Sequence, residues 1–118
     1  MRAETIKRVL DFRDERDWRQ FHNPKDLALS ISLEASELLE LFQWKDSDEA
    51  VARGKAEMAE ELADILSYVI LFADAVDLDL DEIVLSKIEK NAKKYPIELS
   101  KGSKEKYNVL KAQCEVKA

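Results

Sequence analysis

The sequence predicts an all-α protein organised like a four-helix bundle. Apolar residues recur at helical spacing in four successive segments. The 118 residues include only two glycines and two prolines, so turn signals are few and long helices are favoured over a many-stranded sheet. Hydrophobic residues make up 46% of the chain and charged residues 37%, a composition typical of amphipathic helices and not of disorder. The length fits one domain covering residues 1–118.

The first two helices are expected from Glu4 to Trp18 and from Pro24 to about Trp44. Asn23 suits the N-cap of the second helix, and Pro24 suits its first position because the missing N–H costs nothing there. The apolar stripes consist of Ile6, Val9 and Leu10 in the first helix, and of Leu27, Ile31, Leu38 and Leu41 in the second.

A polar stretch from Lys45 to Gly54 predicts the longest connection, in which an acidic run also offers a helix cap. The third helix is expected at about Lys55–Val76. The fourth is expected to begin after the capping residue Asp79 and to end before Pro96. Beyond Ser100 we expect a flexible loop, and then a short helix or tail. The core stripe of the third helix is predicted to be Met58, Leu62, Ile65, Val69, Phe72 and Val76.

Charge and cysteine content narrow the class of protein. The net charge of −6 argues against a surface built for nucleic acid backbones, although a bound divalent cation would still allow a nucleotide. No apolar stretch is long enough to cross a bilayer. Cys114 is the only cysteine and no apolar leader follows Met1, so we expect a soluble protein of the reducing cytoplasm.

Two pairs of carboxylates, Glu34 with Glu37 and Glu61 with Asp64, stand out in the predicted second and third helices. The members of each pair are three residues apart, so on a helix both point the same way. Each pair adjoins an apolar stripe, and few lysines or arginines are spaced to neutralise it. A buried carboxylate must be paired, hydrogen-bonded, protonated or metal-bound. A solvated helix face is the alternative, but the context favours a metal site of four carboxylates.

The available ligands restrict the metal. Di-iron bundle sites use Glu-x-x-His in two helices, and the single histidine, His22, is not at that spacing from any glutamate. A zinc site is not favoured, because the chain has only one histidine and one cysteine, far apart in the sequence, as nitrogen and sulfur ligands. An all-oxygen set suits Mg²⁺, with Mn²⁺ as a substitute, and Mg²⁺ commonly binds the phosphate oxygens of a substrate. The expected reaction is metal-assisted attack of water on a phosphoryl group.

Five runs of residues together resemble one protein family. They are Phe12-Arg13-Asp14-Glu15-Arg16-Asp17-Trp18-Arg19-Gln20-Phe21-His22, Glu34-x-x-Glu37, Leu41-Phe42-Gln43-Trp44, Glu60-Glu61-Leu62-x-Asp64 and Asn91-x-x-x-Tyr95-Pro96. From Phe12 to about Tyr107 the chain resembles the MazG-like all-α nucleoside triphosphate pyrophosphohydrolases, and most closely the dCTP pyrophosphatase branch. The resemblance implies nucleotide-pool cleaning, in which dCTP or a modified pyrimidine deoxynucleoside triphosphate is hydrolysed to the monophosphate and pyrophosphate.

The resemblance also implies roles for individual residues and an assembly. The subunit would form a homodimer or homotetramer, with active sites near subunit contacts. Many relatives carry an acid immediately before the first glutamate, but this chain has Leu33 there, so no role of that acid is carried over. The implied catalytic residues and metal ligands are Glu34, Glu37, Glu61 and Asp64. The implied nucleoside contacts are Trp18, His22, Trp44 and Tyr68, and the implied phosphate or sugar contacts are Lys87, Asn91 and Lys94.

Other interpretations stay open at this point. The tryptophans also suit a core or an interface, and Lys87 also suits neutralisation of the acids. A non-catalytic oligomeric helical module with an acidic binding face is the alternative function, and another pyrophosphate-containing metabolite is an alternative substrate. Self-association has independent support, because Leu29, Leu33 and Leu39 add apolar surface beside the main stripe of the second helix.

Overall fold

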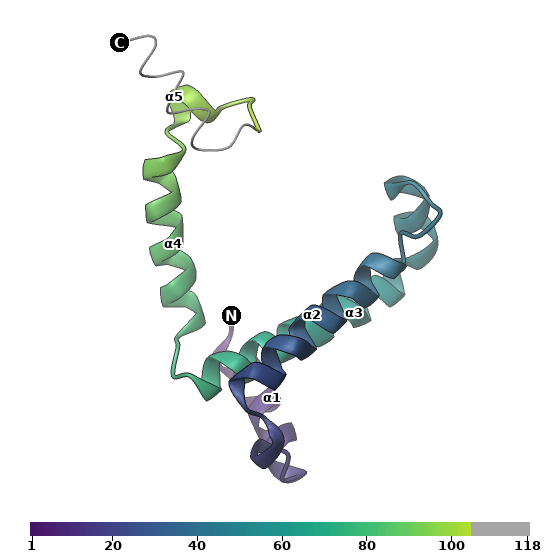
Figure 1. The fold of residues 1–118 in the computed structure, drawn as a ribbon, viewed down its shortest axis with the longest axis vertical. Coiled ribbons are helices and arrows are strands. Elements are labelled where there is room, and N and C mark those ends of the chain that lie inside the picture. Colours follow the sequence, from purple (N-terminus) through teal and green to yellow (C-terminus); the bar gives the residue numbers. More distant parts are fainter. Residues whose placement is uncertain (105–118) are drawn as a thin grey trace. The chain divides into compact units, whose positions relative to one another are not determined.

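The computed structural model describes residues 1–104, and every regular element in that range is a helix (Figure 1). The chain divides after Leu80 into two compact units, each of which is described by itself. The predicted short helix or tail at 107–118 lies outside the described residues. The elements are α1 (Ala3–Glu15), the 3₁₀ turn η1 (Arg19–Phe21), α2 (Pro24–Glu40), α3 (Ser47–Ala75), α4 (Leu80–Lys94) and α5 (Ile97–Ser100).

Helices α2 and α3 form an antiparallel hairpin, and α1 packs against α3 (Figure 1). The start of α2 confirms the sequence prediction: the Asn23 side chain accepts a hydrogen bond from the Asp26 N–H at 2.9 Å, and Pro24 occupies the first turn. Asp46 caps α3 in the same way, accepting from the Glu49 N–H at 2.8 Å. The hairpin places the middle of α2 beside the middle of α3.

Three predicted helix boundaries were wrong. Helix α1 ends at Glu15, because Asp17 takes a left-handed conformation (φ 54°) and the Trp18 N–H bonds back to the Arg13 carbonyl at 3.1 Å. Helix α2 ends at Glu40, four residues before Trp44.

The third error concerns the predicted connection from Lys45 to Gly54. Helix α3 already begins at Ser47, because Asp46 caps it there. Gly54 has non-helical angles (φ −124°, ψ 20°), so two helical segments meet there at a kink within α3. The predicted break at Gly54 is therefore present, and the prediction missed only the helical segment that precedes it. The prediction for the end of the fourth helix is confirmed, since α4 stops at Lys94, before Pro96.

The core of the first unit is small and only partly follows the predicted stripes. Leu27 on α2 is 1% exposed, as its place in the stripe suggests. On α3, however, Leu62 is 50% exposed, although it was predicted to face the core. The residues of α3 that are buried are Ala50, Ile70, Leu71 and Ala73. Apart from Ala50, these residues lie near the C-terminal end of α3. Apolar side chains in the middle of the hairpin therefore remain exposed to solvent.

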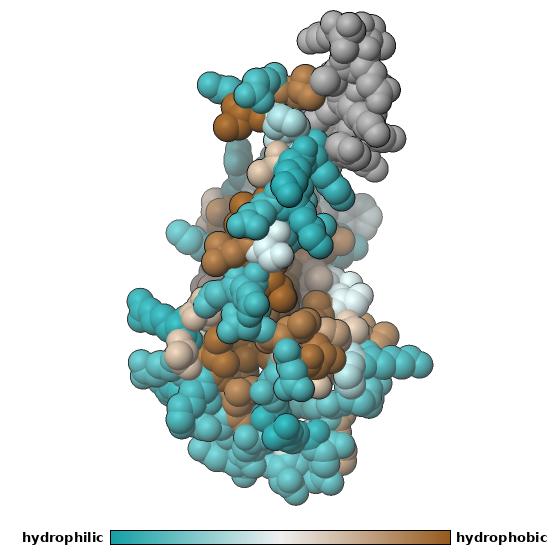
Figure 2. All heavy atoms as spheres, turned by 90° about the vertical axis from the view of Figure 1, so that its left-hand side faces the viewer, coloured by the Kyte–Doolittle hydropathy of each residue, from teal (hydrophilic) through white to brown (hydrophobic). Residues whose placement is uncertain are grey.

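Apolar side chains lie not only in the core but also at the surface, where Figure 2 shows them in brown. Leu29, Leu33 and Leu39 on α2 are 54–71% exposed, which confirms the prediction of apolar surface outside the main stripe. In the second unit, Val84, Leu85 and Ile88 of α4 are more than half exposed. Among the described residues, no helix is both long enough and apolar enough to span a membrane.

Candidate functional site

Three of the four carboxylates predicted from the sequence meet across the α2–α3 hairpin. Glu34 of α2 and Glu61 and Asp64 of α3 each offer a carboxylate oxygen, and these oxygens all lie within 4.8 Å of one another. Helical spacing puts Glu61 and Asp64 on one face of α3, and the antiparallel packing turns that face toward Glu34. Glu37, one turn after Glu34, lies close enough to influence both Glu34 and Glu61.

The electrostatics of this cluster are unfavourable without a cation. Burial, followed by interaction with the Glu37 carboxyl and repulsion from the neighbouring acids, raises the pKa of Glu34 to about 7. Burial and Glu37 likewise raise the pKa of Glu61. A group of like charges held this closely favours protonation or a bound metal ion.

The hydrogen bonding of the cluster points in the same direction. Glu34 and Glu61 each have a buried Oε2 atom with no hydrogen-bond partner. Within residues 1–104, no lysine or arginine forms an ion pair with Glu34, Glu37, Glu61 or Asp64. Unpartnered carboxylate oxygens are suitable ligands for a hard divalent cation such as Mg²⁺. The donor set therefore fits the predicted metal.

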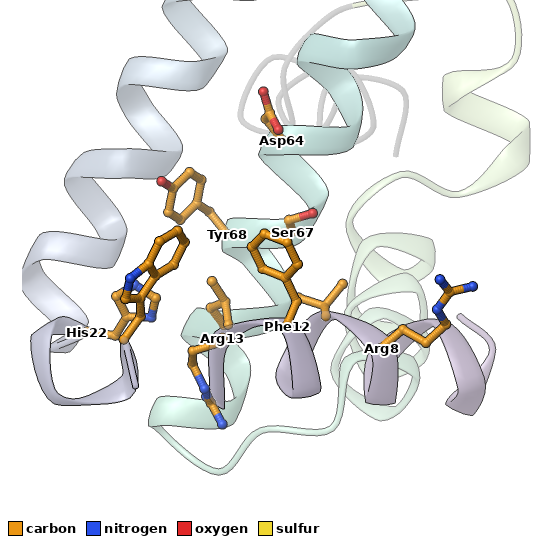
Figure 3. A pocket seen from close by; sticks show the side chains of 10 residues that line it. Arg8, Phe12, Arg13, His22, Asp64, Ser67 and Tyr68 are labelled. Carbon is orange, nitrogen blue, oxygen red and sulfur yellow. The ribbon is translucent and has the colours of Figure 1, made fainter. Parts of the chain in front are cut away.

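A cavity of about 500 Å³ adjoins the acidic cluster (Figure 3). Asp64 belongs both to the cluster and to the lining of this cavity. The side chains that line the cavity come from α1, the segment that follows it, and α3: Arg8, Val9, Phe12, Arg13, Trp18, His22, Asp64, Ser67, Tyr68 and Leu71. The volume lies within the range of small-molecule sites. The site thus joins a carboxylate group to an aromatic-lined hollow.

Aromatic rings form one wall of the cavity. Phe12 and Trp18 pack edge to face, with ring centroids 5.8 Å apart and planes at 74°. The Arg16 guanidinium lies 3.6 Å from the Phe12 ring centroid, so it covers one face of that ring. Trp18 remains 45% exposed. A flat ligand can therefore reach its indole ring without displacing the core.

His22 follows the 3₁₀ turn and also lines the cavity. Its Nδ1 atom is buried and has no hydrogen-bond partner. Burial, and then the positive charge of Arg13, lower the pKa of His22 from its ordinary value. The neutral imidazole is therefore favoured, and a neutral imidazole has one nitrogen that donates and one that accepts hydrogen bonds.

The structure brings together some of the predicted nucleoside contacts and not others. Trp18, His22 and Tyr68 line the same cavity. Figure 3 labels His22 and Tyr68 there. Trp44 lies in the α2–α3 connection with φ 65°, is 92% exposed and does not line the cavity.

The predicted phosphate or sugar contacts lie in the second unit. Lys87, Asn91 and Lys94 are all on α4 and are all exposed. Their assignment to the site stays a prediction.

Sequence reasoning assigned no role to Arg8, Arg13 or Ser67, which also line the cavity. Ser67 could have been predicted from the sequence, because it is three residues after Asp64 and so shares its helix face. Arg13 gave no such signal. Its position depends on a 2.7 Å hydrogen bond to Asp74, which is 61 residues away in the chain.

The fold and the site define an all-α protein with a carboxylate cluster suited to a divalent cation, and the comparisons with known proteins specify the family. The MazG-like family matches residues 29–110, and the chain belongs to it. It is 43% identical to dCTP pyrophosphatase 1 of Bos taurus and 42% identical to that of Homo sapiens, covering 91% of this chain in each case. The alignments span 67% and 66% of those two relatives, about two thirds of their length.

A solved structure agrees with this assignment. The crystal structure of a pyrophosphatase from Archaeoglobus fulgidus superimposes with a TM-score of 0.75 at 45% sequence identity. The match covers 79% of this chain and 90% of that one. The resemblance inferred from the sequence motifs is therefore confirmed, and so is the MazG-like all-α fold.

Proposed function

We propose that this protein hydrolyses a (deoxy)nucleoside triphosphate, dCTP or a modified pyrimidine deoxynucleotide, to the monophosphate and pyrophosphate. The observation that carries the proposal is the convergence of Glu34, Glu61 and Asp64 beside an aromatic-lined cavity. The similarity to dCTP pyrophosphatase 1 supports the choice of nucleotide. Water attacks the α-phosphorus, the bond from that phosphorus to the bridging oxygen breaks, and pyrophosphate leaves.

The acidic cluster is assigned to Mg²⁺, with Mn²⁺ as a substitute. Glu34, Glu37, Glu61 and Asp64 would hold the cation, which supplies positive charge for the phosphate oxygens when bound. The unpartnered Oε2 atoms of Glu34 and Glu61 support this assignment. Because Asp64 also lines the cavity, a nucleotide with its base among the aromatic rings would have its phosphates beside the cluster.

The cavity is assigned to the nucleoside. Trp18 offers an exposed indole for stacking on the base, and His22 and Tyr68 offer polar atoms to its edge or to the sugar. Trp44, which is exposed in the α2–α3 connection, is proposed to reach the base through self-association. Lys87, Asn91 and Lys94 are proposed to contact the phosphates or the sugar, on the strength of the family resemblance.

Self-association as a homodimer or homotetramer is part of the proposal. Leu33, Leu39 and Leu62 on the α2–α3 hairpin are at least half exposed, and such apolar surface is stabilised when a second copy covers it. Light scattering coupled to gel filtration measures the mass directly. A monomer at micromolar concentration would contradict this part. The single cysteine supports a reducing, cytoplasmic setting.

The activity is tested with a panel of nucleoside triphosphates and Mg²⁺, measuring pyrophosphate and orthophosphate separately. We expect pyrophosphate and the monophosphate, with a cytosine nucleotide turned over fastest. Orthophosphate release would exclude attack at the α-phosphorus. Failure to turn over any nucleotide, together with no thermal stabilisation by Mg²⁺ and nucleotide, would favour the non-catalytic interaction module instead. Turnover of another pyrophosphate-containing metabolite alone would redirect the substrate assignment.

A further inference from the structure

Arg13 is the one charged residue among the described residues that is fully buried, at 4% exposure. Its Nε atom donates to Asp14 Oδ1 at 2.8 Å, and its Nη1 atom donates to Asp74 Oδ2 at 2.7 Å. Asp14 is the next residue on the same helix, whereas Asp74 lies near the end of α3. The Arg13–Asp74 ion pair therefore ties the C-terminal end of α1 to α3.

The same residue also shapes the end of α1 through its main chain. The Arg13 carbonyl accepts hydrogen bonds from the Arg16 N–H at 3.3 Å and from the Trp18 N–H at 3.1 Å. These bonds close the helix around Asp17, whose left-handed conformation sends the chain toward the 3₁₀ turn. The position of Trp18 thus depends on where Arg13 is held.

Arg13 is among the residues that line the cavity, but its guanidinium does not point into it. In Figure 3 its guanidinium points away from Tyr68 and Asp64, while the preceding residue, Phe12, points toward Ser67. Phe12 and Trp18 contact each other edge to face. Phe12 immediately precedes Arg13, and the Trp18 N–H bonds to the Arg13 carbonyl, so one anchored residue helps to fix both rings of the aromatic wall.

We propose that Arg13 is a positioning residue for nucleotide binding: its ion pair with Asp74 holds Phe12 and Trp18 in place as the wall on which the base stacks. The inference rests on the function proposed above. It assigns a role in substrate binding to Asp74, which lies ten residues beyond the last acidic ligand. Loss of the pair lets the aromatic wall move, which weakens binding of the base more than it slows the chemical step.

The first test observes Trp18 without any nucleotide. The chain has two tryptophans, so Trp44→Phe leaves Trp18 as the only indole fluorophore. In that background, Arg13→Ala and Asp74→Asn are expected to increase quenching of the fluorescence by acrylamide. Lys7→Ala is the matched control, because it removes an exposed ion pair of the same helix, Lys7 to Asp11 at 2.6 Å. It should leave quenching unchanged.

The second test uses turnover, with Trp44 left intact. Arg13→Ala and Asp74→Asn should each raise KM for the nucleotide about tenfold, with a smaller change in kcat. Arg13→Lys keeps the positive charge but lacks the planar guanidinium that donates through two separate nitrogens. Its KM should lie between those of Arg13→Ala and the unaltered protein. The double variant Arg13→Ala with Asp74→Ala should be no worse than Arg13→Ala alone, because the two residues act as one unit.

The outcomes separate the inference from the proposed function. Unchanged quenching and unchanged KM in Arg13→Ala would overturn the inference, as would equal effects in Lys7→Ala. If circular dichroism shows that Arg13→Ala does not fold, Arg13→Lys and Asp74→Asn decide by the same two measurements. An unaltered protein that hydrolyses no nucleotide would contradict the proposed function, whereas the quenching experiment would still report whether Arg13 positions Trp18.

Discussion

Glu34 on α2 and Glu61 on α3 approach each other across the hairpin, and each keeps a buried Oε2 atom that has no hydrogen-bond partner. Two glutamates in this arrangement destabilise a metal-free protein, because their charges repel and each has lost water on one oxygen. A cation between them removes both penalties. This relationship connects the stability of the fold to the proposed activity.

Replacing Glu61 by glutamine should separate stability from activity. Glu61→Gln keeps the size of the side chain and removes one negative charge, so we expect a melting temperature no lower than that of the unaltered protein when metal is absent. Turnover should fall by about a hundredfold or more, since a proposed ligand to the charge-stabilising cation is lost. Glu57→Gln is the matched control, because Glu57 is an exposed acid one turn earlier on α3. Similar losses in both variants would contradict the assignment.

The stability of the metal-free protein should fall as pH rises through neutrality. Glu34 has its pKa raised from 4.5 to about 7 in the folded chain. An acid with a raised folded-state pKa contributes stability that is full below its unfolded pKa and is lost as pH rises through the folded value. Urea unfolding in a chelator, at about pH 6 and about pH 8, should therefore give the lower free energy of unfolding at the higher pH.

Glu34→Gln provides the comparison for this pH dependence. The lowered pKa of His22 acts in the opposite direction, since its contribution to stability is lost as pH falls. The difference between the unaltered protein and Glu34→Gln cancels the part due to His22. If the free energy of unfolding changes with pH equally in both proteins, the raised pKa of Glu34 is not the cause of the pH dependence.

The end of α3 offers a test of backbone strain. Asp77 has φ 56° and follows the helix, with the Leu78 N–H bonded to the Ala73 carbonyl at 2.9 Å. Glycine adopts this conformation without a Cβ clash, so Asp77→Gly should raise the free energy of unfolding by about 0.5 kcal/mol. Asp77→Val should lower it, because a β-branched side chain is strained at positive φ. Thermal denaturation of the three proteins should rank them glycine, aspartate, valine.

Much of the fold was predictable because it depends on local signals. Asn23 and Pro24 mark the start of α2 by side-chain chemistry alone, and the structure confirms them. The break predicted at Gly54 is present as a kink, but the helical segment before it was missed, because the polar residues after Lys45 were expected to form a connection although Asp46 caps a helix there. Burial of the middle of α3 was overestimated for a different reason. Periodicity identifies the apolar side of a helix but does not say whether this chain or another copy covers it.

The candidate site likewise has one part that could be predicted from local spacing and one part that could not. The spacing of Glu61 and Asp64 predicts that they share a helix face, and the structure places them together with Glu34. The cavity depends on how α1 meets α3, which the Arg13–Asp74 pair helps to fix. Contacts between residues so far apart in sequence leave no periodic pattern, so the composition of the cavity wall could not be read from the chain.

Binding of Mg²⁺ should stabilise the protein more strongly as pH rises. The ligands must lose their protons to bind metal, and the raised pKa values of Glu34 and Glu61 make this incomplete at mildly acidic pH. At a Mg²⁺ concentration one hundred times the dissociation constant, the gain should be about 2.7 kcal/mol. Melting curves with Mg²⁺ and with a chelator, recorded at several pH values, measure it. The Glu34→Gln and Glu61→Gln double variant should show little gain at any pH. An equal gain in that variant would place the bound Mg²⁺ elsewhere on this acidic protein, and the cluster between α2 and α3 would lose its assignment.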